Sequence, residues 1–291
     1  MRKVLLFGGT GNLGKEIAAG LKREAYDLTV AVRNRTKAET LFGASINTVH
    51  ADVTQPHTIA GICKGFDIVI SALGKSVSPF ERSRPSFEQV DLNGNTLILN
   101  DALRNGVRKF VYISAFGSER YRHLEYFRVH YEFEQRLRNA GIDYSILRPP
   151  ALFSAFLDLI QMAKKGRLVN MGRGERLTNP ISESDLANIC LQYIDQRNTA
   201  IGAGGSEILS RKKLNQIIQD VVQPGKKVRT VPMAFVSLML PLLKRFDRNA
   251  YHKLAFFRTV LRHDTIAPRL GTSRFEDYVR QKATETEPLP W

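Results

Sequence analysis

Residues 3–14, KVLLFGGTGNLG, place three evenly spaced glycines directly after a short apolar run. The run at 3–7 predicts a strand that is covered on both faces, as in the middle of a parallel sheet. Gly8, Gly11 and Gly14 permit a tight turn, the approach of a pyrophosphate to the backbone, and close packing of a helix on the strand. Residues 12–23 have the apolar spacing of that helix, whose first amide groups would face the phosphates. Strand, glycines and helix in this order predict a dinucleotide-binding fold. The predicted cofactor contacts here are Gly8, Gly11, Asn12, Leu13 and Gly14.

The segment that follows the second predicted strand is basic where an acidic residue is usual. Residues 27–32 predict this strand, and Arg33, Arg35 and Lys37 come directly after it. A carboxylate here would bind the 2′-hydroxyl of the adenosine ribose, whereas an arginine would attract a 2′-phosphate. We therefore expect NADP(H) to be preferred over NAD(H), with Arg33 and Lys37 binding the cofactor. A solvated basic loop is the alternative.

Strand-like and helix-like segments alternate through the first half of the chain. Four further strands are predicted at 47–51, 66–70, 109–113 and 144–147, and helices at 87–105 and 122–139. This alternation predicts an α/β fold with a Rossmann-type, doubly wound parallel sheet that binds ligands at the carboxyl ends of its strands. Later helical patterns at 153–164, 184–195 and 211–222 indicate a change of architecture. We expect an NAD(P)-binding domain over 1–150 and a smaller, mainly helical substrate-side lobe over 151–291, packed on the same domain.

Composition narrows the classes of partner. The 291 residues include 43 Lys and Arg against 28 Asp and Glu, a net charge of +15. The basic residues are spread along the chain without a zinc-ligand or RNA-reading motif, so nucleic acid is an unlikely partner, while anionic small molecules and membranes remain open. Cys63 and Cys190 are far apart, which predicts buried free thiols and no metal site. The first apolar run is too short for a signal peptide, and no stretch reaches the ~20 apolar residues of a membrane helix, so we expect a cytoplasmic protein.

Several motifs together resemble the short-chain dehydrogenase/reductase superfamily, in its atypical, NmrA-like and extended branch. The motifs, all within residues 1–190, are FGGTGNLG, AVRN, HADVTQP, ISALG, KFVYISAFG, DYSILRPP and NPISESDLA. The resemblance implies that Ser114 and Tyr126 are catalytic. It also implies cofactor contacts beyond the glycine loop, namely Asp52 and Val53 at the adenine, Ala72, Leu73 and Gly74 along the cofactor, and Pro149 beside the nicotinamide.

His130 is a departure from the YxxxK motif of that superfamily. It stands where the family has lysine, four residues after Tyr126, so the two side chains share a helix face. In family members the lysine holds the nicotinamide ribose and lowers the pKa of the tyrosine. An imidazole with an ordinary pKa of ~6.5 would be partly charged near neutral pH and would activate Tyr126 less. We expect His130 to act with Ser114 and Tyr126, and a packing role for Tyr126 and His130 is equally open.

Two classes of function follow from these residues. One is an NADP(H)-dependent oxidoreductase, reductase or epimerase-like, in which Ser114 and Tyr126 polarise the oxygen of a small carbonyl or quinone-type substrate. The alternative is a non-catalytic NADP(H)-binding redox sensor, regulator or assembly factor of the NmrA-like type.

Residues 231–246, VPMAFVSLMLPLLKRF, form an apolar segment with basic flanks. Such a segment suits peripheral contact with an anionic membrane, a cover over the substrate cleft, or a subunit interface in a homo-oligomer.

Overall fold

The computed structural model describes residues 1–285, which separate into two compact units that interleave along the chain. Unit 1 comprises Met1–Lys75, Pro85–Arg148 and Leu186–Ile201. Unit 2 comprises Ser76–Arg84, Pro149–Asp185 and the residues from Gly202 on. The second stretch of unit 2 begins at Pro149, beside the division that the sequence predicts at residue 150, while 186–201 returns to unit 1.

Unit 1 is built on a seven-stranded sheet with the order β3-β2-β1-β4-β5-β6-β9. The strands are β1 (Lys3–Phe7), β2 (Asp27–Val32), β3 (Asn47–His50), β4 (Ile68–Ser71), β5 (Lys109–Ile113), β6 (Asp143–Arg148) and β9 (Thr199–Gly202). All neighbouring pairs from β3 to β6 are parallel. The predicted doubly wound parallel sheet is therefore confirmed.

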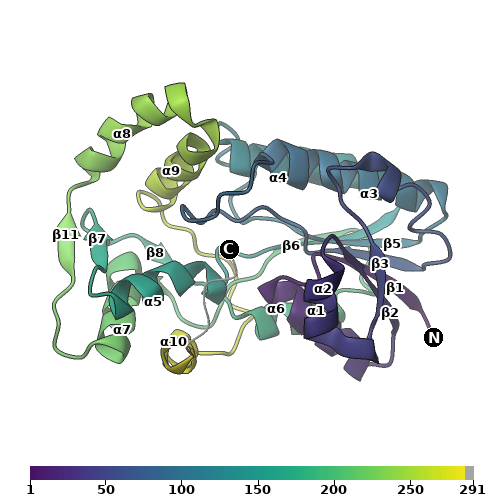
Figure 1. Cartoon of the computed structure of the whole chain (residues 1–291), viewed down its shortest axis with the longest axis horizontal. Coiled ribbons are helices and arrows are strands. Elements are labelled where there is room, and N and C mark those ends of the chain that lie inside the picture. The colour runs from purple at the N-terminus through teal and green to yellow at the C-terminus, as the bar shows by residue number, and fades with distance from the viewer. Residues whose placement is uncertain (286–291) are drawn as a thin grey trace. The chain divides into compact units, whose positions relative to one another are not determined.

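Helices cover both faces of this sheet, with α1 and α2 on one side and α3 and α4 on the other (Figure 1). Their bounds are α1 (Asn12–Arg23), α2 (Arg35–Phe42), α3 (Asn95–Arg104) and α4 (Glu125–Arg138). Because both faces are covered, the strands of the middle are largely apolar, and every residue of β4 and β5 is buried, the polar Ser71 and Lys109 included. A π-helical segment at Glu88–Gly94 precedes α3. Cys63 and Cys190 are buried free thiols, as predicted.

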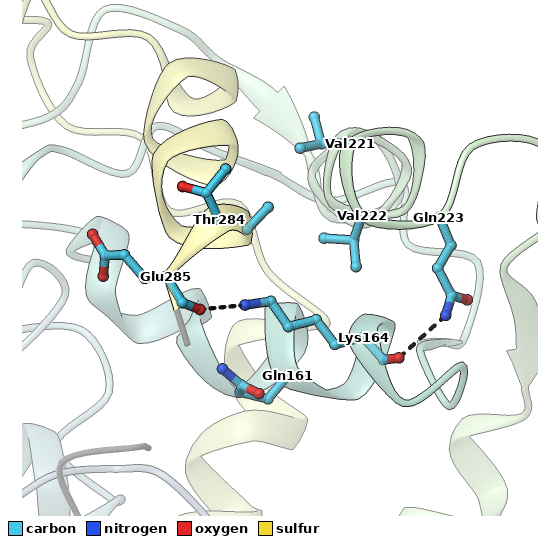
Figure 2. A pocket seen from close by; sticks show the side chains of 8 residues that line it. Gln161, Lys164, Val221, Val222, Gln223, Thr284 and Glu285 are labelled. Atoms are coloured by element: carbon cyan, nitrogen blue, oxygen red, sulfur yellow. Dashed lines mark hydrogen bonds between the residues drawn. The ribbon is translucent and has the colours of Figure 1, made fainter. Parts of the chain in front are cut away.

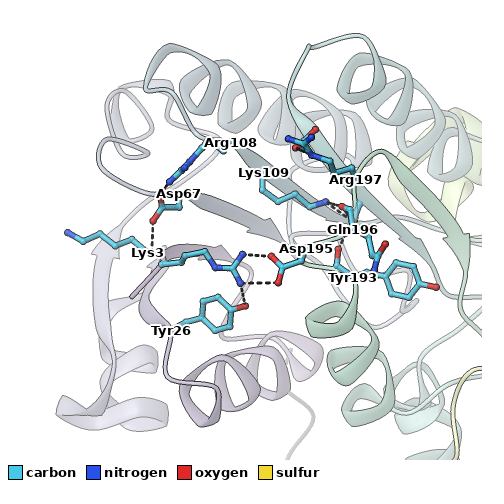
Figure 3. A network of polar contacts seen from close by, with 12 residues as sticks. Lys3, Tyr26, Asp67, Arg108, Lys109, Tyr193, Asp195, Gln196 and Arg197 are labelled. Atoms are coloured by element: carbon cyan, nitrogen blue, oxygen red, sulfur yellow. Dashed lines mark hydrogen bonds and ion pairs between the residues drawn. The ribbon is translucent and has the colours of Figure 1, made fainter.

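Polar contacts attach the returning segment 186–201 to the rest of unit 1 (Figure 3). Arg2 donates to the Asp195 carboxylate and to the Tyr26 hydroxyl, the latter at 2.7 Å. The buried Lys109 ammonium donates to Ser145 Oγ at 2.8 Å and to the backbone carbonyl of Gln196. Burial lowers the pKa of Lys109 to about 8.

Unit 2 is mainly helical. Its helices are α5 (Leu157–Lys164), α7 (Arg211–Val222), α8 (Met233–Phe246), α9 (Arg248–Val260) and α10 (Phe275–Thr284), and α6 (Glu183–Gln192) leads the chain back to unit 1. Two small sheets pair β7 (Val169–Met171) with β11 (Arg229–Val231) and β8 (Leu177–Thr178) with β10 (Leu209–Ser210). Phe153, Phe156, Leu214, Ile218 and Phe275 are among the buried residues of its hydrophobic core.

Within residues 1–285, every helix is too short or too polar to cross a membrane. The same described part of the chain brings no three His, Cys, Asp or Glu side chains together as a metal site would need.

Candidate functional site

The glycine loop after β1 is shaped by close backbone contacts. Gly8 has a φ of +78°, and a Cβ there would lie 2.5 Å from the carbonyl oxygen of Ala72, in the loop after β4. A Cβ on Gly14 would collide with the Gly8 carbonyl oxygen and lie 2.6 Å from Gly9 Cα. The Gly11 N–H closes the turn by donating to the Gly8 carbonyl at 3.0 Å. Side chains at Gly8 and Gly14 would therefore open the loop.

The first turn of α1 carries amide groups that no side chain caps. Gly11 is the N-cap residue and offers no side-chain acceptor, and the first turn has no acidic residue. The first amide groups of a helix lack acceptors within the helix, and they attract anions together with the helix dipole. Asn12, Leu13 and Gly14 therefore present N–H groups of the kind that bind a pyrophosphate. The loop and helix fit a dinucleotide cofactor.

The adenosine side of the predicted site has a cation and an anion close together. Arg33 is exposed just after β2, and Asn34 starts α2 by accepting a hydrogen bond from the Lys37 N–H at 2.9 Å. Burial raises the pKa of Asp52, but hydrogen bonds from Thr54 and the charge of Arg33 outweigh it, so the pKa lies below its ordinary value. Asp52 is therefore an anion that partly offsets the charge of Arg33.

Val53 and the segment Ala72–Gly74 lie near the π-helical segment. A Cβ on Gly94 would lie 2.9 Å from Val53 Cβ, and one on Gly74 would lie 3.2 Å from Asp91 Oδ1. Because β1 and β4 are neighbours although β2 and β3 come between them in sequence, their carboxyl ends form the switch point of the sheet. Ligands bind at such switch points in doubly wound folds. The predicted contacts after β1 and β4 thus meet at one edge.

A buried polar cluster surrounds His130. Its Nδ1 lies 2.6 Å from the Tyr112 hydroxyl, and its Nε2 lies 3.7 Å from Asp91 Oδ1. Asp91 also accepts from the Lys75 backbone N–H, at 3.2 and 3.3 Å. Burial raises the pKa of Asp91 to about 8, against the opposing influence of Lys75.

His130 itself is neutral at neutral pH. Burial lowers the pKa of its imidazole to about 3, because the ring lies on the inner face of α4. The sequence-based expectation of a partly charged imidazole is therefore wrong. The reason is burial between α4 and β5, which sequence spacing alone does not measure.

Tyr126 lies in the first turn of α4 and is half-buried. Its ring meets the His130 ring edge-on, with centroids 4.8 Å apart, and also contacts Phe87 and Phe127. Burial raises the pKa of the Tyr126 hydroxyl, and Asp91 acts in the same direction. The phenol thus keeps its proton at neutral pH and can donate it, but cannot act as a base there.

Ser114 follows β5 and belongs to a second buried network. Its hydroxyl donates to Glu134 Oε1 at 2.5 Å, and its N–H donates to the Leu147 carbonyl at 2.8 Å. Arg148 Nε donates to the same Glu134 oxygen at 2.9 Å, and the Arg148 guanidinium also pairs with Glu119 at 2.7 Å. Glu134 is fully buried. The hydroxyl hydrogen of Ser114 is therefore engaged within the protein.

Sequence reasoning missed Glu134 and Asp91. The sequence does contain a signal for them, because each is a charged residue on the apolar face of a predicted helix. Glu134, for example, follows His130 by four residues and so shares its helix face. Pro149 is buried and begins the second stretch of unit 2, directly after Arg148.

A separate hollow of about 610 Å³ lies in unit 2, at the ends of α5, α7 and α10 (Figure 2). Lys164 Nζ is its cation, and it donates to the backbone carbonyls of Lys282 and Glu285 at 3.2 and 2.8 Å. None of the predicted site residues lines this hollow. Among the described residues that line the hollow, Lys164 is the cation, and its ammonium already has main-chain partners, so they offer little free positive charge for recognising a ligand.

The model of the NAD(P)H-binding family matches residues 8–197, about two thirds of the chain. The chain therefore belongs to this family, and the predicted NAD(P)-binding part of the chain is confirmed.

Two curated relatives with different names are similar to this chain. The photosystem II assembly factor Ycf39 of Trieres chinensis is 22% identical over 294 residues, which cover 98% of this chain and 88% of the relative. The chloroplastic divinyl chlorophyllide a 8-vinyl-reductase of Arabidopsis thaliana is 24% identical over 264 residues, covering 82% of this chain and 62% of the relative.

A solved structure with a similar fold is the NADPH-dependent quinone oxidoreductase QOR2 of Escherichia coli, complexed with NADPH. It superposes with a TM-score of 0.73 at 18% identity and covers 96% of this chain and 99% of that chain. This likeness shows the fold.

Proposed function

We propose that the protein is an NADP(H)-dependent oxidoreductase, reductase or epimerase-like, that acts on a small carbonyl or quinone-type substrate. The observation that carries the proposal is the placement of Tyr126. A tyrosine that keeps its proton stands in the first turn of α4, in the same unit as the glycine loop that fits the cofactor. A relative named as a reductase and a fold neighbour named as an NADPH-dependent oxidoreductase support the same class.

Each residue has a role that its contacts allow. A bound nicotinamide would supply the hydride, and Tyr126 would donate a proton to the substrate oxygen. Ser114 gives its hydrogen to Glu134 at 2.5 Å, so it would keep lone pairs for accepting a hydrogen bond rather than a proton for donating one. His130, neutral and bonded to Tyr112, would hold the Tyr126 ring in place by edge contact.

The preference for NADP(H) rests on Arg33. Because no carboxylate follows β2, the exposed guanidinium would pair with a 2′-phosphate, with Lys37 in support. Arg33→Ala should weaken NADPH binding by about 10- to 100-fold, roughly 1 to 3 kcal/mol, and leave NADH binding unchanged. Isothermal calorimetry with both cofactors measures this, and Arg35→Ala, at the next exposed arginine, is the matched control. Equal affinities for both cofactors in the unchanged protein would contradict the preference.

A second candidate function is a non-catalytic NADP(H)-binding assembly factor or redox sensor. Two observations favour it, namely the engaged hydroxyl of Ser114 and the neutral His130 at the lysine position. Relatives named as photosystem II assembly factors support this candidate.

A turnover screen separates the two functions. Purified protein with NADPH is tested against quinones, aldehydes and ketones, with oxidation of NADPH as the readout. For an enzyme, Tyr126→Phe should lower kcat by about 100-fold or more without changing the Kd for NADPH, since one proton donor is lost. Tyr131→Phe, on the same helix, is the control and should retain turnover. Binding of NADPH without turnover of any of these substrate classes would support the assembly factor or sensor instead.

The cytoplasmic location of the protein stays a prediction.

A further inference from the structure

Helix α8 turns an apolar stripe toward solvent. Leu238, Leu242 and Phe246 are 78%, 61% and 77% exposed, while Leu240 on the other side of the helix is only 6% exposed. The three exposed residues are four positions apart and share one helix face. We call these three residues the α8 face. A surface helix normally turns its polar side outward, so this face indicates a partner.

The helix is held within unit 2. It packs against α9, and α9 contains the buried Lys253, whose Nζ lies 2.8 Å from the Glu81 carboxylate. The helix that carries the α8 face is therefore held in place by its packing on α9.

Basic residues flank α8 on both sides in the sequence. Residues 226–248 include six basic residues and one acidic residue, and the basic ones are all exposed, namely Lys226, Lys227, Arg229, Lys244, Arg245 and Arg248. The acidic residue, Asp247, caps α9 by accepting from the Ala250 N–H at 3.0 Å. The Arg245 guanidinium lies 5.9 Å from the centre of the Phe246 ring, so positive charge adjoins the apolar stripe directly.

We propose that the α8 face docks on an anionic phospholipid membrane, with the helix lying along the surface. Leucine and phenylalanine would enter the boundary of the acyl chains, and the lysines and arginines would meet the phosphates. A second copy of this chain fits less well, since its α8 face would bring the same positive charges. The proposal is independent of whether the protein is an enzyme.

Vesicle co-sedimentation tests this proposal. Full-length protein is spun with vesicles of phosphatidylcholine, alone or mixed with phosphatidylglycerol, at low and high salt. We expect binding to the mixed vesicles only, and weaker binding at high salt because the charges are screened. Leu238→Ser/Phe246→Ser and Lys244→Gln/Arg245→Gln should each weaken binding by about 10-fold or more.

Matched controls lie elsewhere in unit 2. Ile208→Ser/Leu270→Ser removes two apolar side chains that are each 42% exposed, and Arg262→Gln/Arg269→Gln removes two exposed charges. Both control variants should bind vesicles like the unchanged protein, and thermal unfolding should show that all four variants are folded.

Three results would overturn the proposal. One is protein that stays in the supernatant with mixed vesicles at low salt. Another is equal binding of the α8-face and control variants. A third is self-association in sedimentation velocity that Leu238→Ser/Phe246→Ser abolishes, because the α8 face would then belong to a second copy.

Discussion

The glycine loop after β1 and the region between β5 and α4 lie in the same unit but differ in whether their polar groups have hydrogen-bond partners within the protein. In the loop, uncapped N–H groups at the start of α1 are left for a ligand. Between β5 and α4, side chains satisfy one another, with Ser114 bonded to Glu134 and His130 to Tyr112. Cofactor binding thus depends on uncapped backbone N–H groups, whereas the chemistry depends on how firmly these side-chain pairs are held.

The largest expected effect comes from breaking the side-chain region. Arg148→Met would leave the carboxylate of the fully buried Glu134 without its cation. We expect the free energy of unfolding to fall by about 3 to 5 kcal/mol in chemical denaturation. Arg148→Met/Glu134→Gln should recover part of the loss, because no buried charge remains.

The control for that variant is Arg197→Met, which breaks the exposed ion pair with Asp143. It should lower the free energy of unfolding by less than about 1 kcal/mol. If Arg148→Met lost no more than this, the network around Glu134 would be loosely held, contrary to the comparison.

The next effect concerns the glycine loop. Gly14→Ala would place a Cβ against backbone atoms of Gly8 and Gly9 that cannot rotate away. We expect NADPH affinity by calorimetry to fall by about 100-fold or more, roughly 3 kcal/mol. Gly20→Ala, later in the same helix, meets the end of the Leu191 side chain and should bind NADPH within a few-fold of the unchanged protein. Wild-type affinity in Gly14→Ala would place the cofactor elsewhere.

A pH series tests the burial of His130. Its pKa is about 3 in the folded protein, against an ordinary value of 6.5. Between these values the unfolded chain takes up a proton that the folded protein does not, so this group lowers the free energy of unfolding as the pH falls. His130→Gln should therefore gain about 2 kcal/mol relative to the unchanged protein on going from pH 7 to pH 5.

The control for the pH series is His57→Gln, at an exposed histidine. Asp91, with its pKa of about 8, acts in the opposite direction, because its contribution to stability falls as the pH rises from about 4 to 8. Asp91 is present in all three proteins. Parallel stability curves for His130→Gln and the unchanged protein would mean that the imidazole titrates normally.

The smallest expected effect comes from giving the glycine loop a side-chain hydrogen bond of the kind found between β5 and α4. Gly11→Ser gives α1 a side-chain cap, with the new Cβ 3.3 Å from the Gly8 carbonyl oxygen. We expect the free protein to gain a few tenths of a kcal/mol in thermal unfolding, and NADPH affinity to fall a few-fold because the hydroxyl occupies a ligand-binding amide. The control is Ser210→Gly, which removes the side-chain cap of α7. This variant should lower the stability of the protein in thermal unfolding and leave NADPH binding unchanged. A stabilised variant with unchanged affinity would contradict the role of the free amides.

Much of unit 1 could be predicted from the sequence because its elements have strong local patterns. The bounds of α1, β2 and β5 agree with the prediction to the residue, since glycines or charged residues mark their ends. The predicted helix at 122–139 starts later, at Glu125, because residues 121–124 form a turn that the Leu124 N–H closes on the Tyr121 carbonyl. The π-helical segment at 88–94 lies within the helix predicted at 87–105. The spacing of its apolar residues fits both the wider π-helical turn and the α-helical turn, so this spacing could not distinguish the two kinds of helix.

The site was predictable where the backbone defines it and less so where side chains do. The spacing of Gly8, Gly11 and Gly14 predicts the loop directly. The partner of Ser114 comes from a different element, α4, and the pKa of His130 depends on how deeply that helix is packed. Strands of two or three residues such as β8 and β11 are too short to show the alternation on which a strand prediction depends.

The late return of residues 186–201 to unit 1 bears on how the chain can fold as it is synthesised. β9 lies next to β6 in the sheet, yet all of 149–185 is translated between them. Until residue 202 has left the ribosome, β6 is an unprotected edge strand, and Asp195 is not there to bind Arg2. The sheet of unit 1 is therefore completed only after the first two stretches of unit 2 have emerged. A fragment ending at residue 150 would expose the edge of β6 and would aggregate rather than fold as a minimal nucleotide-binding domain.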